Sequence, residues 1–479
     1  MSALGYSQLH TLGIAEAAEA VAAGEISAEQ LAASALARLE TLGPRFNALV
    51  ELDTDGALEA ARAVDVSRAA GRQLGPLAGV PLAHKDLFYR AGRACVGGSL
   101  IRADFIAETT ACVLERLDAA GALDLGRLHL AEFALSPTGF NAHYGHARNP
   151  WSLDHCSGGS SSGSGAAVAA RLVYGSLGSD TGGSVRHPAA MCGITGLKPT
   201  HGLVPLYGAM PLAPSLDTIG PLVRSARDAA RMLSVIAGPD PRDAATNAAP
   251  RLKYEAALVG NLSGLTIAVP QGYYRDAATP DIRLLLDESL HVLTSAGARI
   301  VETSAPDMSL LNALMQIMMG AEAATLHRRW LKERPQDYGA QVRARIMPGL
   351  AYPATRYAEA LMMRAGMVRE WLKACMGDAD LVHIPTLAVP VPTIAETTEG
   401  DPEEVAAAIG RVTHCTRAIN YLGLPALSVP CGFADNGLPA AFQLVGRPFA
   451  ETVLLRAGDA YQRLTDFHTR VPPGCGPLD

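Results

Sequence analysis

Residues 158–186 combine glycine and serine with apolar runs in a pattern that few folds accommodate. Two serine-bearing glycine loops, at 158–165 and 180–186, flank the apolar stretches 166–170 and 172–178. Flexible Gly/Ser linkers lack such apolar runs, which need burial. Glycine also permits backbone conformations that are closed to other residues. The block therefore predicts a loop, a buried helix, a strand and a second loop within a folded core.

Lysine is rare in this chain, with five residues against 35 arginines. Lys85 closes the apolar, strand-like run 80–83. Ser160 follows it by 75 residues, and Ser184 follows Ser160 by 24 residues. A buried lysine can lose its proton and act as a base, whereas a guanidinium stays protonated. A single lysine after a strand is usually a surface residue, and each glycine loop alone is a common turn. The three features together make Lys85 a candidate base for the two serines.

The composition excludes several classes of partner. Net charge is −7 with no basic cluster, so nucleic acid is not expected to bind. No window reaches the roughly 18 uninterrupted apolar residues of a membrane span, so no membrane association is expected. Residues 1–6 also lack the basic and apolar regions of a secretory signal. The eight cysteines are scattered without a CxxC pair, which suits free thiols in a reducing compartment, and we expect a cytoplasmic protein.

Metal chemistry has little support in the sequence. His143 and His146 are three residues apart in a stretch typical of a loop, and no HExxH motif is present. We therefore expect no metal and no other cofactor.

Strand-like and helix-like segments alternate along the whole chain, which predicts an α/β layered fold. Ser27 begins a capping box for a helix that we expect to stop at Gly43 and Pro44. Two later helical segments are rich in methionine, whose adaptable side chain could line an apolar substrate channel. Ordinary core packing is the simpler explanation for them. These methionines are at positions 308, 315, 318, 319, 362, 363 and 367.

The two serine loops suggest nucleophilic catalysis. A serine hydroxyl is a poor nucleophile until a base removes its proton, and a neutral lysine can do this if burial lowers its pKa. No histidine has an evident relay role, and only a structure can place His187, just beyond Ser184. The consecutive amides of 181–184 could stabilise a developing oxyanion.

The motifs of this chain strongly resemble those of the amidase signature hydrolases, and the resemblance covers nearly the whole chain. It rests on Gly-Gly-Ser-Ser at 158–161, Gly-Ser-Asp-Thr-Gly-Gly-Ser-Val-Arg at 178–186, Pro-Ala-Ala-Met-Cys-Gly at 188–193 and Gly-Leu-Lys-Pro-Thr at 196–200. The lysine strand at 79–86, Asn-Pro-Trp at 149–151 and the stretches 215–221, 420–426 and 437–439 also match. One departure is Ser162, where the family commonly has glycine; it puts in question the backbone path after Ser161.

The resemblance implies a Ser-cisSer-Lys triad. Ser184 would be the nucleophile, Ser160 the bridging serine after a cis Gly159–Ser160 bond, and Lys85 the base. The implied oxyanion hole consists of the amides of Thr181, Gly182 and Gly183, with Ser184 closing the loop. Supporting positions are Ser161, Asp180 and Arg186, and the implied substrate contact is Ala134.

The resemblance also implies a fold and an activity. We expect a mixed, largely parallel central sheet covered by helices on both faces, in a single domain of residues 1–479. Residues 1–70 would form an N-terminal helical segment, 79–225 the catalytic core with the signature block 158–200, and 256–466 the part that completes the sheet and shapes the pocket. The expected activity is hydrolysis of C–N bonds in aryl or alkyl amides, with carbamates (urethanes) and esters as further substrates. A homodimer is conceivable.

Three alternatives remain open from the sequence. The Gly-x-Ser-x-Gly pattern at 159–163 would suit an α/β-hydrolase esterase with Ser161 as nucleophile, but its elbow needs a preceding strand and residues 149–155 are typical of a loop. The chain could be the glutaminase subunit of a tRNA-dependent amidotransferase, although nothing basic suggests tRNA. A nucleotide-binding glycine loop is disfavoured because the chain contains no Gly-Lys dipeptide.

Overall fold

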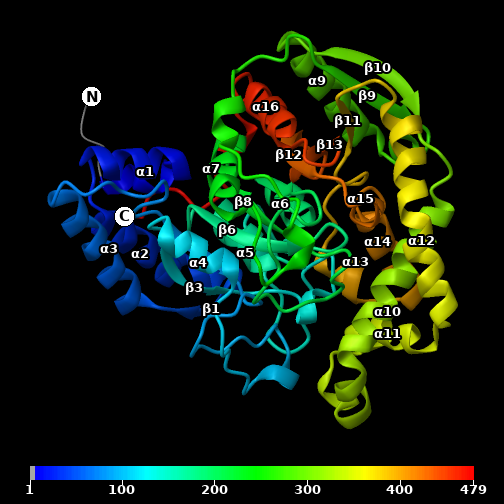
Figure 1. Cartoon of the computed structure of the whole chain (residues 1–479), viewed down its shortest axis with the longest axis horizontal. Helices are drawn as coiled ribbons and strands as arrows, with labels where there is room; N and C mark the ends of the chain where they lie inside the picture. The colour runs from blue at the N-terminus through cyan, green and yellow to red at the C-terminus, as the bar shows by residue number, and fades with distance from the viewer. Residues whose placement is uncertain (1–5, 479) are drawn as a thin grey trace.

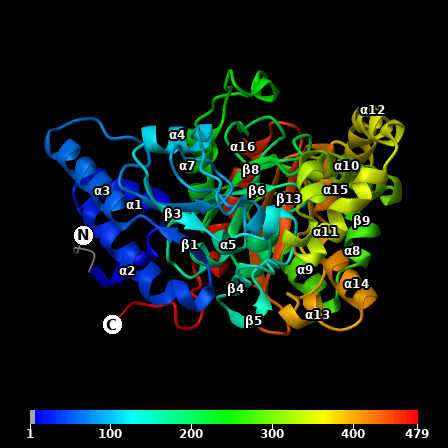
Figure 2. The same cartoon turned by 90° about the horizontal axis from the view of Figure 1, so that it is seen from below.

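The computed structural model describes residues 6–478 (Figures 1 and 2). The predicted lack of a secretory signal in residues 1–6 therefore falls almost entirely outside the described residues. Within residues 6–478, no helix is both long and apolar enough to cross a membrane. All eight cysteines are buried and unpaired.

An 11-stranded sheet forms the centre of the molecule, in the order β1-β3-β2-β6-β8-β7-β12-β13-β11-β9-β10. Its strands are β1 (Leu49–Leu52), β2 (Pro81–Lys85), β3 (Leu123–Leu128), β6 (Gly175–Asp180), β7 (Thr195–Lys198), β8 (Thr218–Val223), β9 (Thr266–Gln271), β10 (Arg299–Ser304), β11 (Leu381–Pro385), β12 (Ala426–Phe433) and β13 (Pro439–Gly446).

The sheet is mixed, which confirms the predicted α/β class, but its parallel pairs are fewer than we predicted. Parallel neighbours occur only towards the two flanks, where β2 pairs with β3 and β6, and β9 pairs with β10 and β11. From β6 to β11 through the centre every pair is antiparallel. The central strands are joined by reversals such as the β12–β13 hairpin, and strand-like composition alone does not reveal strand direction.

Helices surround this sheet. They are α1 (Ile14–Ala23), α2 (Ala28–Phe46), α3 (Thr54–Ala69), α4 (Cys112–Ala119), α5 (Ser162–Ala169), α6 (Arg186–Cys192), α7 (Ala226–Ile236), α8 (Tyr273–Asp276), α9 (Pro280–Ser295), α10 (Ser309–Glu333), α11 (Ala340–Ile346), α12 (Ala354–Trp371), α13 (Ile394–Thr398), α14 (Pro402–Thr413), α15 (Arg417–Leu422) and α16 (Glu451–Gln462). Both views place α1–α3 at one end of the molecule and α10–α12 at the other (Figures 1 and 2).

Close contacts of two glycines show that α6 and α16 cover opposite faces of the sheet. A Cβ on Gly196 of β7 would lie 2.6 Å from Ala189 of α6, and Gly196 pairs in register with Ser428 of β12. A Cβ on Gly458 of α16 would lie 2.6 Å from Leu427, the neighbour of Ser428. Because successive side chains of a strand point to opposite faces, α6 and α16 lie on opposite sides. The predicted cover on both faces is therefore present.

Two local predictions were wrong. The helix α2 begins after the predicted capping box at Ser27, but it passes through Pro44 and ends at Phe46. Proline breaks a helix chiefly by clashing with the preceding turn. The helix nevertheless continues for two residues past Pro44, and its end is held in the core by the fully buried Phe46.

The second wrong prediction is the loop at 149–155. This segment forms a two-stranded hairpin of β4 (Arg148–Asn149) and β5 (Ser152–Cys156), separate from the central sheet. Asn149 stabilises the hairpin, because its side-chain amide donates to the carbonyls of Cys156 and Met191, and such side-chain bonding is not visible in the pattern of apolar residues.

Candidate active site

Lys85 is the last residue of β2 and is fully buried. Its Nζ lies 2.7 Å from Oγ of Ser160 and 2.9 Å from Oγ of Ser179. Burial lowers the pKa of the Lys85 amine to about 7, against the opposing influence of the carboxylates of Asp217 and Asp180. A large fraction of this amine is therefore neutral at pH 7 and above, the form that can accept a proton.

Ser160 is held by the loop that begins the signature block. The Gly159–Ser160 peptide bond is cis, as the resemblance implies. Gly159 has no room for a side chain, since a Cβ there would lie 2.3 Å from the carbonyl oxygen of Ser136 and 2.5 Å from the amide of Gly139. The loop then enters α5, whose first residue is the divergent Ser162. The backbone accommodates this serine in a fully buried position.

Ser184 lies on the loop between β6 and α6 and is 8% exposed. The two serine loops are tied together by the N–H of Ser161, which donates to the carbonyl of Ser184 at 3.3 Å. The hydroxyls of Ser160 and Ser184 are not hydrogen-bonded to each other. Lys85 and Ser160 are thus in direct contact. Ser184 is linked to this pair only by the backbone hydrogen bond between its carbonyl and the N–H of Ser161, the neighbour of Ser160.

Gly183 shapes the Ser184 loop. Its φ is +129°, and a Cβ there would lie 2.3 Å from the ring of His187, so only glycine fits. Its N–H donates to Oδ1 of Asp180 at 2.8 Å. The N–H groups of Thr181, Gly182 and Ser184 make no hydrogen bond to any other described residue. The Gly183 amide, one member of the implied oxyanion hole, thus already donates to a carboxylate in this structure, and the hole itself stays a prediction.

Asp180 and Arg186 form a fully buried ion pair beneath this loop, with Nε 3.0 Å from Oδ2. Arg186 also donates to Gln443, Asn420 and the carbonyl of Thr416. Although burial opposes ionisation, the charge and hydrogen bonds of Arg186 lower the pKa of Asp180 below its usual range. Asp180 in turn accepts from the amides of Gly183, Val185 and Arg186, so the pair fixes the loop.

Two further predicted positions are Ser161, which the resemblance gives as supporting, and Ala134, which it gives as a substrate contact. Ser161 donates to the carbonyl of Ser179 at 3.4 Å, and the side chain of that same Ser179 contacts the Lys85 amine. Ala134 has a φ of +60° and lines the cavity described below.

His187 is buried between the carbonyl of Gly159 at 3.3 Å and Oγ1 of Thr416 at 2.7 Å. Burial lowers the pKa of its imidazole to about 4, so the ring is neutral at pH 7. No hydrogen bond joins it to Ser184 or Lys85 in the described structure. His187 thus supports the loop and is not placed to relay a proton.

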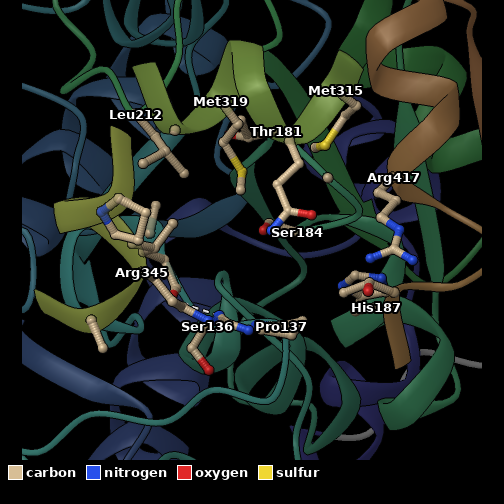
Figure 3. Close-up of a pocket in the computed structure, with 18 of the residues that line it drawn as sticks. Ser136, Pro137, Thr181, Ser184, His187, Leu212, Met315, Met319, Arg345 and Arg417 are labelled. Carbon is tan, nitrogen blue, oxygen red and sulfur yellow. Dashed lines mark hydrogen bonds between the residues drawn. The ribbon is translucent and has the colours of Figure 1, made fainter. Parts of the chain in front are cut away.

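A cavity of about 300 Å³ opens above Ser184 (Figure 3). Its apolar lining includes Leu212 and two residues of α10, Met315 and Met319. The other methionines predicted as candidates differ: Met308 and Met318 are buried in the core, and Met362 is 84% exposed. Met315 and Met319 therefore line a cavity while Met308 and Met318 pack in the core, and the use of that cavity by substrate stays a prediction.

Several polar residues of the site were missed by the sequence analysis, among them one serine and two arginines. Ser179 contacts the Lys85 amine, while Arg345 of α11 and Arg417 of α15 line the cavity. Ser179 lies inside the signature block and could have been considered from its position at the end of a predicted strand. Nothing in the sequence distinguishes the two arginines from the other 33. Among residues 6–478, no group of three or more His, Cys, Asp or Glu is arranged to hold a metal ion.

Comparison with known proteins identifies the family. The family model described as Amidase matches residues 30–455. The chain belongs to the amidase family. Its similarity to curated amidase-family proteins extends over the full length: the A subunit of the glutamyl-tRNA(Gln) amidotransferase of Chloroflexus aggregans is 40% identical, with 97% of this chain and 99% of that protein covered.

Solved structures of the amidase signature family superimpose closely. A bacterial aryl acylamidase of the amidase signature family is 26% identical with a TM-score of 0.86, covering 98% of this chain and all of that one. A chain from a vestigial protein complex, described as revealing the evolutionary origins of an s-triazine catabolic enzyme, is 34% identical with a TM-score of 0.87. The match covers 95% of this amidase and 98% of that chain. The chain is accordingly a hydrolase of the amidase signature type that acts on C–N bonds.

Proposed function

We propose that this amidase cleaves amides through an acyl-enzyme on Ser184, with Ser160 and Lys85 as the proton relay. The observation that carries the proposal is the buried Lys85 amine, whose pKa is lowered to about 7 and which lies 2.7 Å from Ser160. A neutral amine in that position can accept the Ser160 proton while Ser160 accepts that of Ser184. Because the two serine hydroxyls are not hydrogen-bonded, they must approach each other during the reaction.

The reaction begins with acylation of Ser184. Ser184 Oγ forms a bond to the carbonyl carbon, and its proton passes by way of Ser160 to Lys85. The oxyanion is stabilised by the free amides of Thr181, Gly182 and Ser184. The proton returns through Ser160 to the leaving nitrogen as the C–N bond breaks. Water, deprotonated by the same relay, releases the acid and restores Ser184.

The apolar lining supports aryl or alkyl amides as substrates. Leu212, Met315 and Met319 can pack against a ring or an alkyl chain, and a cavity of about 300 Å³ is at the small end of the usual range for ligand pockets. Carbamates and esters present a similar carbonyl to the same groups, so urethane cleavage is part of the proposal. We propose that the chain works alone or as a homodimer on small molecules.

Labelling with a fluorophosphonate, followed by peptide mass spectrometry, tests the nucleophile. We expect the adduct on Ser184 and its loss in Ser184→Ala, with labelling retained in Ser161→Ala. An adduct on Ser161 would favour the esterase alternative. Turnover of a panel of anilides, aryl carbamates, aliphatic amides and glutamine would then define the substrate class.

A second candidate is the glutaminase subunit of a tRNA-dependent amidotransferase. It is favoured by one observation, the identity of about 40% to proteins with that name. Ammonia release from glutamine alone, with no turnover of any anilide or carbamate by the purified chain, would support it over the first proposal.

A further inference from the structure

Arg417 lies inside the catalytic cavity as a cation that no described carboxylate neutralises. It begins α15 and lines the cavity together with Ser184 and His187. Its Nε is buried and forms no hydrogen bond, and no aspartate or glutamate among residues 6–478 forms a salt bridge with it. A buried polar group without a partner is costly, so such groups are usually satisfied.

The backbone at Arg417 is fixed against the Ser184 loop. The preceding residue, Thr416, donates from Oγ1 to the carbonyl of Gly182 at 2.8 Å and contacts the ring of His187. In Figure 3, Arg417 extends from α15 towards His187, on the side of Ser184 away from Leu212. Arg417 and Leu212 therefore lie on opposite sides of Ser184, and the second arginine of the lining, Arg345, lies on the Leu212 side.

The other charges of the cavity leave this cation uncompensated. His187 is neutral at pH 7, and the described lining contains no aspartate or glutamate. Its remaining cation, Arg345, donates from Nη1 to the carbonyl of Leu135 at 3.1 Å. Arg186, close by in space, shows the contrasting case of an arginine fully paired within the protein. That lining therefore offers no negative charge to a substrate ammonium group.

From this arrangement, and given the proposed function, we infer that the amidase selects substrates that carry a carboxylate, and that Arg417 binds it. The substrate would place an apolar part against Leu212 and Met319 and its carboxylate at the Arg417 guanidinium, which offers a planar set of donors suited to this group. Amides with a free ammonium group, including glutamine, would be poor substrates because the cavity repels their charge.

Three matched anilides test the inference. Glutaric mono-4-nitroanilide is anionic, pentanoic 4-nitroanilide is neutral, and 5-aminopentanoic 4-nitroanilide is cationic. We expect kcat/KM for the anion to exceed that of the neutral compound by about tenfold or more, and the cation to be the poorest of the three. A neutral compound that is as good as the anion would overturn the inference.

Variants then assign the preference to one residue. Arg417→Gln should bring the ratio of anionic to neutral kcat/KM close to one, Arg417→Lys should restore part of it, and Arg345→Gln should preserve most of it. A ratio that is unchanged in Arg417→Gln, or that falls equally in Arg345→Gln, would contradict the assignment. Thermal melts of each variant show whether the fold is retained.

A binding measurement separates this inference from the proposed function. Calorimetry with Ser184→Ala protein should detect glutarate but not the uncharged glutaramide, and the glutarate signal should be lost when Arg417→Gln is added. This result does not depend on turnover. Failure of fluorophosphonate labelling would contradict the proposed chemistry, whereas equal binding of the two probes would contradict the role of Arg417.

Discussion

Lys85 and Lys198 are both the last residue of a buried strand, β2 and β7, and both are fully enclosed by protein. Burial lowers the pKa of each amine to about 7. Their contacts differ: Lys85 touches the hydroxyls of Ser160 and Ser179, whereas Lys198 donates only to the carbonyl of Pro199 at 2.8 Å within the described structure. A carbonyl cannot supply a proton, so a low pKa makes a lysine a base only where a hydroxyl faces it.

The largest expected effect comes from replacing Lys85. Lys85→Ala removes the base, and Lys85→Arg retains a charge that cannot be neutralised, so both should lower kcat by about 10³-fold or more. Steady-state kinetics on an anilide, with a thermal melt as the control for folding, measures this. If Lys85→Arg were active, the relay through a neutral amine would be wrong.

Activity should also follow the ionisation of this amine. With a pKa near 7, the Lys85 amine is protonated and inactive at lower pH, so kcat/KM should rise about tenfold per unit below pH 7 and level off above it. The Lys198→Met variant should show the same inflection. If kcat/KM fell as the pH rose over this range, the Lys85 amine would not act as a base. If the inflection moved in Lys198→Met, the pH dependence would reflect Lys198 as well as Lys85.

Ser179 should have a smaller effect. Ser179→Ala removes the second hydroxyl contact of the Lys85 amine, and a net hydrogen bond of about 1.5 kcal/mol corresponds to roughly tenfold in kcat. We expect KM to stay constant, because Ser179 does not line the cavity. A lower kcat accompanied by a higher KM would instead indicate that the substitution disturbs the pocket.

The smallest kinetic effect is expected for Lys198→Met, within about threefold of the parent protein in kcat. Its effect should appear in stability. A lysine whose folded pKa is lowered binds its proton more readily in the unfolded chain, so stability rises with pH between about 7 and the ordinary value of 10.5. Denaturation at several pH values should show this slope reduced by about 1.4 kcal/mol per pH unit in the variant. An unchanged slope would mean that Lys198 is charged in the folded protein.

The sequence points to the groups proposed to react more directly than to their surroundings. Lys85, Ser160 and Ser184 stand in motifs whose spacing and resemblance point to them directly. The hydrogen bond from Gly183 to Asp180 depends on how one loop folds back on itself. Arg417 and Ser184 line the same cavity although they are more than 230 positions apart in the sequence. Neither leaves a local signal. The antiparallel centre of the sheet was missed for the same reason, since strand direction depends on which distant segments pair.

The groups proposed to react come from residues 85–184, but much of the cavity wall comes from α10, α11 and α15, which lie in the later half of the chain. The proposed chemistry and the proposed selectivity are thereby encoded in separate stretches of the gene. Exchange of the later stretch between two amidases could transfer substrate preference while the proton relay stays in place, which offers evolution, and the protein engineer, a way to vary one without rebuilding the other.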